Sequence, residues 1–195
     1  MIVGKNNNII ILSIMLGVNR KSINEQTASY RKQWGFKCVF ISHQKADAKI
    51  CKHIADYLIK AGIDIYFDEY DLDLKEYYQN NNPQGVVNSI KKGIQQSTHM
   101  LCVISPNTLY SKWVPWEIGY GYDKTQVAAL TLKGIQNEQL PDYLKTVTLI
   151  RGTRTLNDYI SNLAGEYKEK MFSSNRIINE STMSHPLDNY LDWNL

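Results

Sequence analysis

The stretch "HMLCVISPNTLYSKWVPWEIGYG" (residues 99–121) decides the fold class of this chain, because it joins a buried strand to a helix. Met100–Ile104 is an uninterrupted apolar run, which is typical of a strand buried on both faces of a parallel sheet. A Ser-Pro pair ends the run, and the following helix is expected to carry Trp113 and Glu117. Residues four apart lie on one face of a helix, so this indole and this carboxylate are expected to line the same wall.

A proline within this expected helix fixes where the helix begins. Pro115 stands two residues before Glu117. Because proline lacks a backbone donor, a helix tolerates it only in the first turn. The helix is therefore expected to begin near Lys112, which places Glu117 early in it.

Outward from this stretch, apolar runs alternate with amphipathic helical patterns. The expected strands are Cys38–Ser42, Ile63–Phe67, Met100–Ile104, Val127–Leu132 and Val147–Ile150. The expected helices besides the one that carries Glu117 are Ile50–Ala61, Val86–Gln96 and Leu156–Lys170. This alternation predicts an α/β fold: a flavodoxin-like, five-stranded parallel sheet of order 2-1-3-4-5 with helices on both faces.

The chain divides into one domain and two flanking segments. We expect the domain to span residues 37–171, with an N-terminal extension at 1–36 and a polar C-terminal tail at 172–195. The extension is expected to add a helix or strand to the domain. Its apolar run Ile9–Val18 has ten residues, whereas a helix that spans a bilayer needs about twenty. We therefore expect no membrane anchoring.

Composition excludes several classes of function. The 22 Lys and Arg residues against 19 Asp and Glu residues give a net charge of only +3, with no basic stripe for nucleic acid. The three cysteines, Cys38, Cys51 and Cys102, form no CxxC pair and do not cluster with histidines. They are expected to be buried free thiols, which predicts no metal site and a reducing compartment, most simply the cytoplasm.

Polar and aromatic residues follow the expected strands. In open α/β sheets, ligands bind at the carboxyl ends of the strands. The residues expected there are Ser42 and His43 after the first strand, Phe67 and Asp68 after the second, and Ser105 after the third.

Several familiar chemistries do not fit these positions. No glycine-rich loop follows the first strand, which excludes a dinucleotide fingerprint and a P-loop. The paired acids of a phospho-acceptor domain and the Gly-x-Ser-x-Gly turn of a serine hydrolase are also missing. Glu117 then has two interpretations: a solvated charge beside core tryptophans, or the chemical centre of the protein.

Five segments of the chain resemble a TIR (Toll/interleukin-1 receptor) domain, from about Lys37 to Lys170. They are "KCVFISHQKAD", "LIKAGIDIYFDEYD", "SIKKGIQQSTHMLCVISPNTLYSKWVPWEI", "AALTL" and "TVTLI". The third is the most specific, because the Ser-Pro strand end, the Ser-x-Trp and the glutamate occur together in the family's order.

The resemblance implies either an enzyme that cleaves NAD⁺ or a scaffold that assembles immune complexes. In the enzymes a glutamate on the helix after the third strand is catalytic, and Glu117 matches that position. The residues that by resemblance or position would bind the substrate are Ser42, His43, Phe67, Asp68, Ser105 and Trp113. NAD⁺ would be the substrate, and no other cofactor is expected.

One carboxylate suffices for this chemistry. Nicotinamide is cationic in NAD⁺ and leaves as a neutral molecule, so the reaction needs no general acid, unlike ordinary glycoside hydrolysis. The remaining oxocarbenium-like ribose is stabilised by a nearby anion, a role that Glu117 can fill. Trp113 and Phe67 offer flat faces on which the nicotinamide or adenine ring can stack.

Three functional readings stay open at this point. A stand-alone TIR protein resembles the signal-producing component of Thoeris-type antiphage systems, in which a separate effector senses a nucleotide product. The second reading is a non-catalytic scaffold that self-associates through the loop at 68–85. The third is an enzyme like the nucleoside deoxyribosyltransferases, which share a similar fold and a catalytic glutamate.

Overall fold

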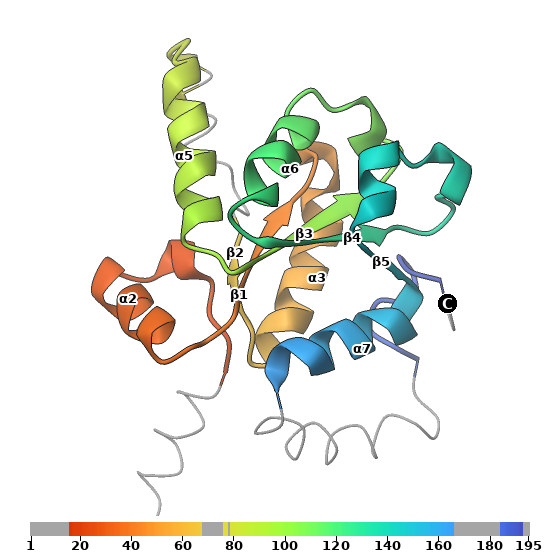
Figure 1. Cartoon of the computed structure of the whole chain (residues 1–195), viewed down its shortest axis with the longest axis horizontal. Coiled ribbons are helices and arrows are strands. Elements are labelled where there is room, and N and C mark those ends of the chain that lie inside the picture. Colours follow the sequence, from red (N-terminus) through yellow and green to blue (C-terminus); the bar gives the residue numbers. More distant parts are fainter. Residues whose placement is uncertain (1–15, 68–75, 78, 166–183, 193–195) are drawn as a thin grey trace, which may run out of the picture.

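Five parallel strands form the single sheet of this protein, in a computed structural model that describes residues 16–67, 76–77, 79–165 and 184–192. The order is β2-β1-β3-β4-β5, which confirms the predicted α/β fold and its topology (Figure 1). The strands are β1 (Cys38–Ser42), β2 (Asp64–Tyr66), β3 (His99–Ile104), β4 (Gln126–Thr131) and β5 (Thr148–Arg151).

The helices predicted at Ile50–Ala61 and Val86–Gln96 are present, with ends that differ from expectation by one to three residues. Helices precede, connect and follow the strands. They are α2 (Glu25–Gln33), α3 (Ala48–Lys60), α5 (Pro83–Gln95), α6 (Val114–Tyr122) and α7 (Gly152–Ala164). The predicted start of the last helix, Leu156, was wrong by four residues, and residues 166–170 of that predicted helix lie outside the described residues. Helix α7 starts directly after β5, and it ends before Gly165, whose φ of 68° is a backbone conformation that glycine adopts without strain.

Two hydrophobic clusters lie on the two faces of the sheet. The first includes Ile54 and Leu58 of α3 and Leu156 and Ile160 of α7. The second includes residues of α5 and α6, packed on the opposite side chains of the same strands. The C-terminal segment 184–192 adds two leucines to the first cluster. The helices therefore cover both faces, as a parallel sheet requires.

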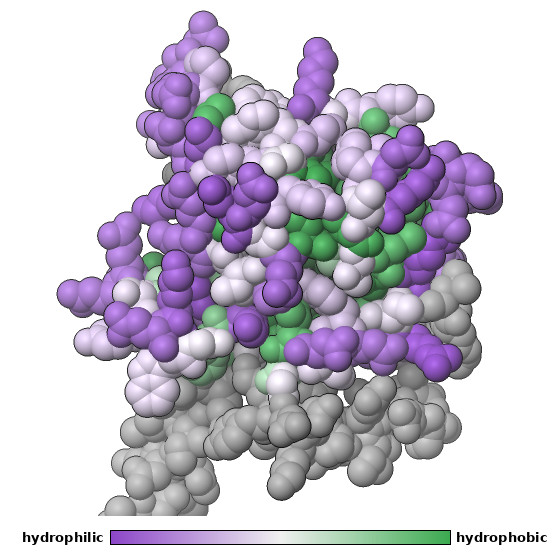
Figure 2. All heavy atoms as spheres, viewed as in Figure 1, coloured by the Kyte–Doolittle hydropathy of each residue, from purple (hydrophilic) through white to green (hydrophobic). Residues whose placement is uncertain are grey.

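The surface beside α6 is partly apolar. Figure 2 shows apolar residues reaching the surface next to this helix, whereas hydrophilic residues dominate around α5. Two aromatic side chains of α6, Trp116 and Tyr122, are exposed by 36% and 48%. The helix predicted to carry the functional carboxylate thus also presents apolar surface to solvent.

All three cysteines are free and buried, which confirms the prediction. Burial raises the pKa of Cys38 to about 11 and also raises the pKa values of Cys51 and Cys102. A thiol reacts as its thiolate, so these side chains are packing residues.

The described part of the N-terminal extension runs along the free edge of β2. Val18 accepts a hydrogen bond from the backbone N–H of Ile65 at 2.9 Å, and Asn19 forms a parallel bridge with Ile65. A side chain on Gly17 would meet the carbonyl oxygen of Ile63 at 2.0 Å, so only glycine allows this approach. Among the described residues no helix is long and apolar enough to cross a membrane.

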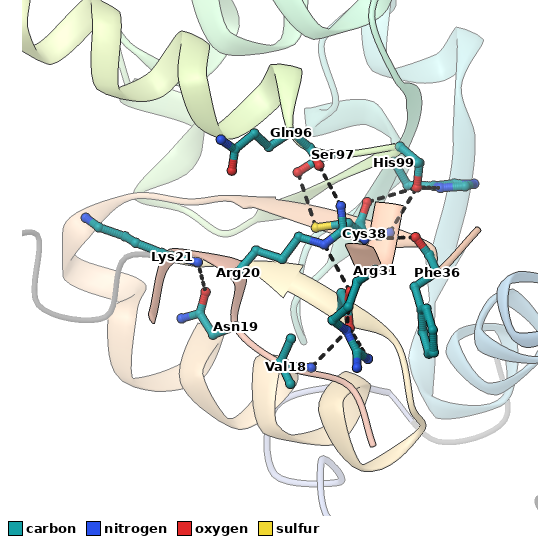
Figure 3. Close-up of polar contacts among 12 residues, drawn as sticks. Val18, Asn19, Arg20, Lys21, Arg31, Phe36, Cys38, Gln96, Ser97 and His99 are labelled. Carbon is teal, nitrogen blue, oxygen red and sulfur yellow. Dashed lines mark hydrogen bonds and ion pairs between the residues drawn. The ribbon is translucent and has the colours of Figure 1, made fainter. Parts of the chain in front are cut away.

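A buried ion cluster anchors the extension to the amino end of β2 (Figure 3). Asp64 is fully buried and lies 3.0 Å from Nε of Arg20 and 2.7 Å from Nη2 of Arg31. The other two guanidinium nitrogens of Arg20 donate hydrogen bonds to the carbonyl oxygens of Gln96 and Phe36. Because each charge has a partner and further hydrogen bonds, the cluster fixes the extension against the sheet.

Candidate functional site

Glu117 lies in the first turn of α6. The helix begins at Val114, close to the predicted start, and Pro115 occupies its first turn. The backbone N–H of Glu117 donates to the carbonyl oxygen of Trp113 at 2.9 Å. The residue is buried, with an exposed fraction of 8%. The partial positive charge at a helix N-terminus favours a carboxylate at this position.

Ser42, at the carboxyl end of β1, holds this carboxylate directly. Its hydroxyl donates to Oε2 of Glu117 at 2.6 Å, and the serine is 1% exposed. Ser42 is the register partner of Cys102 on β3, and the charge of Glu117 adds to the effect of burial in raising the pKa of Cys102. The carboxylate therefore lies at the carboxyl end of β1, beside the neighbouring strand β3. A hydrogen bond to an ionised acceptor is among the stronger ones, so Ser42 orients the carboxylate.

An aromatic row continues from the helix start. Trp113 stands directly before the helix, and its ring meets that of Trp116 edge to face, with centroids 6.0 Å apart. The Trp116 ring stacks on that of Tyr120 at 5.8 Å. The Ser111 hydroxyl accepts hydrogen bonds from the backbone N–H groups of Trp113 and Val114. These bonds stabilise the start of the helix. Sequence reasoning found Trp113 through its spacing and Ser111 as the serine of the Ser-x-Trp motif, although it gave Ser111 no role, and it missed Tyr120.

His43 and Phe67 form a second aromatic contact, at the ends of β1 and β2. Their ring centroids lie 5.0 Å apart with the planes tilted by 45°. Nδ1 of His43 lies 3.1 Å from the carbonyl oxygen of Ile41. A carbonyl only accepts, so this contact assigns the hydrogen to Nδ1. Phe67 is 3% exposed. Asp68, also predicted for this site, lies outside the described residues.

Ser105 belongs to a different cluster. Its hydroxyl donates to Oδ2 of Asp47 at 2.5 Å, and Asn107 donates to the other carboxylate oxygen at 2.8 Å. Ser105 also accepts the backbone N–H of Thr108 at 3.1 Å. These contacts tie the turn after β3 to the start of α3. Asp47 was missed by sequence reasoning, although its place directly before a helix was a usable signal.

The structure thus brings together Ser42 and Glu117 in one contact, and His43 and Phe67 in another. Both pairs stand at the carboxyl end of the sheet, where α/β folds bind ligands. Among the described residues no three His, Cys, Asp or Glu side chains gather in a way that would hold a metal ion. The chemistry available is that of an oriented carboxylate at an end of the sheet that also carries aromatic side chains.

Comparison with known proteins extends this description. A family model described as "TIR domain" matches residues 39–163. The chain is also similar to a curated protein of Bacillus cereus (strain MSX-D12), named "Probable 3' cyclic ADP-D-ribose synthase ThsB'", at 26% identity over 82 residues. That alignment covers 42% of this chain and 42% of the relative, so it spans less than half the length of either.

Proposed function

Because this chain belongs to the TIR domain family, we propose that it cleaves NAD⁺ at the bond between nicotinamide and ribose. The observation that supports the proposal most directly is the buried carboxylate of Glu117, oriented by Ser42 in the first turn of α6. A solvated surface charge, the other interpretation of this residue, is hard to reconcile with a side chain that is 8% exposed.

The proposed reaction begins when the C–N glycosidic bond breaks and its electron pair stays with nicotinamide, which leaves as a neutral molecule. Positive charge then develops on C1′ and the ring oxygen of the ribose. Glu117 supplies a fixed negative charge next to it, and preorganised charge of this kind lowers the barrier most in a site with little water. Attack by water, with loss of a proton, gives ADP-ribose; attack by a nucleophile of the same molecule gives a cyclic product.

The remaining predicted residues take supporting roles in this proposal. Trp113, His43 and Phe67 would form the walls against which the substrate rings pack. Ser105 and Asp68 stay predictions as residues that contact the substrate. The hydrogen bond from Ser105 to Asp47 favours a role one step away, in holding the turn after β3.

The product is proposed to act as a signal in antiphage defence, sensed by a separate effector protein. The similarity to a protein named as a cyclic ADP-ribose synthase favours cyclisation over simple hydrolysis. We further propose that TIR–TIR contacts between copies assemble the active form, which makes high protein concentration a sensible condition for assays.

Mass spectrometry of the products tests the proposal. Purified protein at high concentration is incubated with NAD⁺ and, in parallel, with a panel of nucleosides. We expect nicotinamide together with linear or cyclic ADP-ribose, and loss of both in Glu117→Ala. The matched control is Glu138→Ala, because Glu138 is an exposed acid. Nicotinamide release that survives Glu117→Ala would remove this residue from the mechanism.

The two alternatives give different results in the same experiment. Base exchange on the nucleoside panel without turnover of NAD⁺ would indicate a deoxyribosyltransferase-like enzyme. Inactivity with every substrate, together with stable TIR–TIR complexes, would indicate a scaffold.

A further inference from the structure

Within the described residues, the N-terminal extension contacts Phe67 of the proposed site through the side chain of Asn19. Its Nδ2 donates to the carbonyl oxygen of Phe67 at 2.7 Å, and its Oδ1 accepts the backbone N–H of Phe67 at 3.2 Å. Phe67 directly follows β2, which ends at Tyr66. The amide group therefore bonds both polar backbone groups of one residue, in the way that a neighbouring strand would.

Asn19 is itself held rigidly by its neighbours. The residue forms a parallel bridge with Ile65, and its Oδ1 also accepts the backbone N–H of Lys21 at 3.2 Å. Next to it, Arg20 donates to Asp64 at 3.0 Å within the buried ion cluster. Figure 3 shows Asn19 beside Val18 and Lys21, with Arg20 directed towards Gln96 and Phe36. Because the backbone of Asn19 is held in this way, its side chain can hold Phe67 in a defined position.

Phe67 carries this constraint to the wall of the site. Its ring lies 5.0 Å from that of His43, which follows Ser42, the partner of Glu117. The chain of contacts runs from Asn19 through the Phe67 backbone and ring to His43. We propose that Asn19 is a positioning residue, which sets the place of the Phe67–His43 wall for the substrate. The functional part of this inference rests on the proposed NAD⁺ cleavage.

The chemistry of the contact requires an amide. Asparagine offers one donor group and one acceptor group, which match the C=O and the N–H of Phe67. Aspartate keeps the acceptor but places a second oxygen against the carbonyl oxygen of Phe67, where two acceptors repel. Alanine removes both hydrogen bonds. Asn19→Asp and Asn19→Ala should therefore both weaken the hydrogen bonding that holds the backbone of Phe67. Only the second substitution makes the side chain smaller.

The structural part is tested by NMR, which does not depend on activity. In wild type, the Phe67 amide and the His43 ring resonances report the hydrogen bond and the ring contact. We expect both to shift in Asn19→Ala and Asn19→Asp. The matched control is Asn24→Ala, which removes a side-chain hydrogen bond to Thr27 in the same extension. Unchanged Phe67 and His43 resonances in both Asn19 variants would overturn the proposal.

The functional part is tested by steady-state kinetics of nicotinamide release. A displaced wall weakens substrate binding, whereas Glu117 stays in place, so we expect KM to rise about fivefold with kcat within about twofold. A merely structural loss would instead lower kcat through the fraction of folded enzyme and leave KM unchanged, and that result would overturn the positioning role. If wild type releases no nicotinamide, the proposed function fails, while the NMR result still decides whether Asn19 positions the wall.

Discussion

Two buried carboxylates stand at opposite ends of the same sheet, and each accepts a hydrogen bond from a different kind of donor. Asp64, at the amino end of β2, is bonded by the guanidinium groups of Arg20 and Arg31. Glu117, at the carboxyl end of β1, accepts a hydrogen bond from the neutral hydroxyl of Ser42. A cation cancels the charge of its partner, but a hydroxyl orients a carboxylate without neutralising it.

This difference separates an acid that builds the fold from an acid suited to chemistry. The Asp64 cluster joins three parts of the chain, because Arg20 also donates to the carbonyl oxygens of Phe36 and Gln96. The Ser42–Glu117 contact instead holds a negative charge at the end of the sheet where α/β folds bind ligands. The comparison predicts that substitution of Asp64 lowers the stability of the protein, whereas substitution of Glu117 lowers its activity.

Asp64→Asn is expected to have the largest effect, and on stability. The substitution leaves two buried guanidinium groups facing a neutral amide, which typically costs about 3–5 kcal/mol. Urea denaturation of the variant measures the loss in the free energy of unfolding. Asp158→Asn is the control, because Asp158 is an exposed acid. A loss below about 1 kcal/mol for Asp64→Asn would contradict the comparison.

Glu117→Gln is expected to affect catalysis instead. Nicotinamide release should fall by about 10²–10³-fold, the usual consequence of removing one preorganised electrostatic group. Stability should change little, since the glutamine carbonyl can still accept the Ser42 hydrogen bond. Kinetics and urea denaturation on one preparation, with Glu138→Gln alongside, measure both. A variant that unfolds as readily as Asp64→Asn would make Glu117 a structural acid.

Ser42→Ala is expected to have a smaller effect on the same assay. A buried hydrogen bond to a charged group contributes about 1.5–3 kcal/mol, so loss of orientation should lower kcat about tenfold or more. Ser22→Ala, at an exposed serine, is the control. Wild-type kcat in Ser42→Ala would show that the helix alone orients Glu117.

The sheet could be predicted because its strands are local apolar runs. The prediction of β1 at Cys38–Ser42 matches the structure in both bounds, and that of β3 differs by one residue at its start. Helix ends were less predictable, since they depend on the backbone conformation of single residues such as Gly165. Glycine directly after a helical run is a usable signal for a helix end, and the prediction of 156–170 did not use it.

The site was only partly predictable, for a related reason. Trp113 and Glu117 share a helix, so their spacing was informative, and Pro115 correctly indicated the first turn. Contacts between distant segments leave no such pattern. Asn19 and Phe67 are 48 positions apart, and Asp64 pairs with arginines that no motif marks. Tertiary packing alone determines those pairs.

The comparison between charged and neutral partners extends to the segments that flank the family match. The described part of the N-terminal extension is held by the Asp64 ion cluster, whereas residues 184–192 are held at His185 by neutral hydrogen bonds. Nδ1 of His185 accepts the backbone N–H of Leu187 at 3.1 Å, so Nε2 carries the hydrogen that bonds the Tyr57 hydroxyl at 2.9 Å. The Tyr57 hydroxyl in turn donates to Asn157 at 2.7 Å.

Mild acid is therefore expected to loosen the C-terminal segment, the smallest effect predicted here. Burial lowers the pKa of His185 below its usual 6.5, although the Asp188 charge acts in the opposite direction. The released segment then takes up a proton more readily than the docked one, so docking is strongest above pH 6.5 and weakens as pH falls below it. Hydrogen exchange of the Lys133 and Thr153 amides, which donate to Tyr190 and Asp192, measures this after correction for intrinsic rates.

Two controls assign the effect to His185. The Ile65 amide, which donates to Val18 at the amino end of the sheet, should keep its protection over the same pH range, because an ion cluster holds that segment. His185→Gln should remove the pH dependence, whereas His53→Gln, which changes the ring stacked on Tyr190, should leave it. Protection of Lys133 and Thr153 that stays constant between pH 7.5 and about 5 would show that apolar packing alone holds the segment.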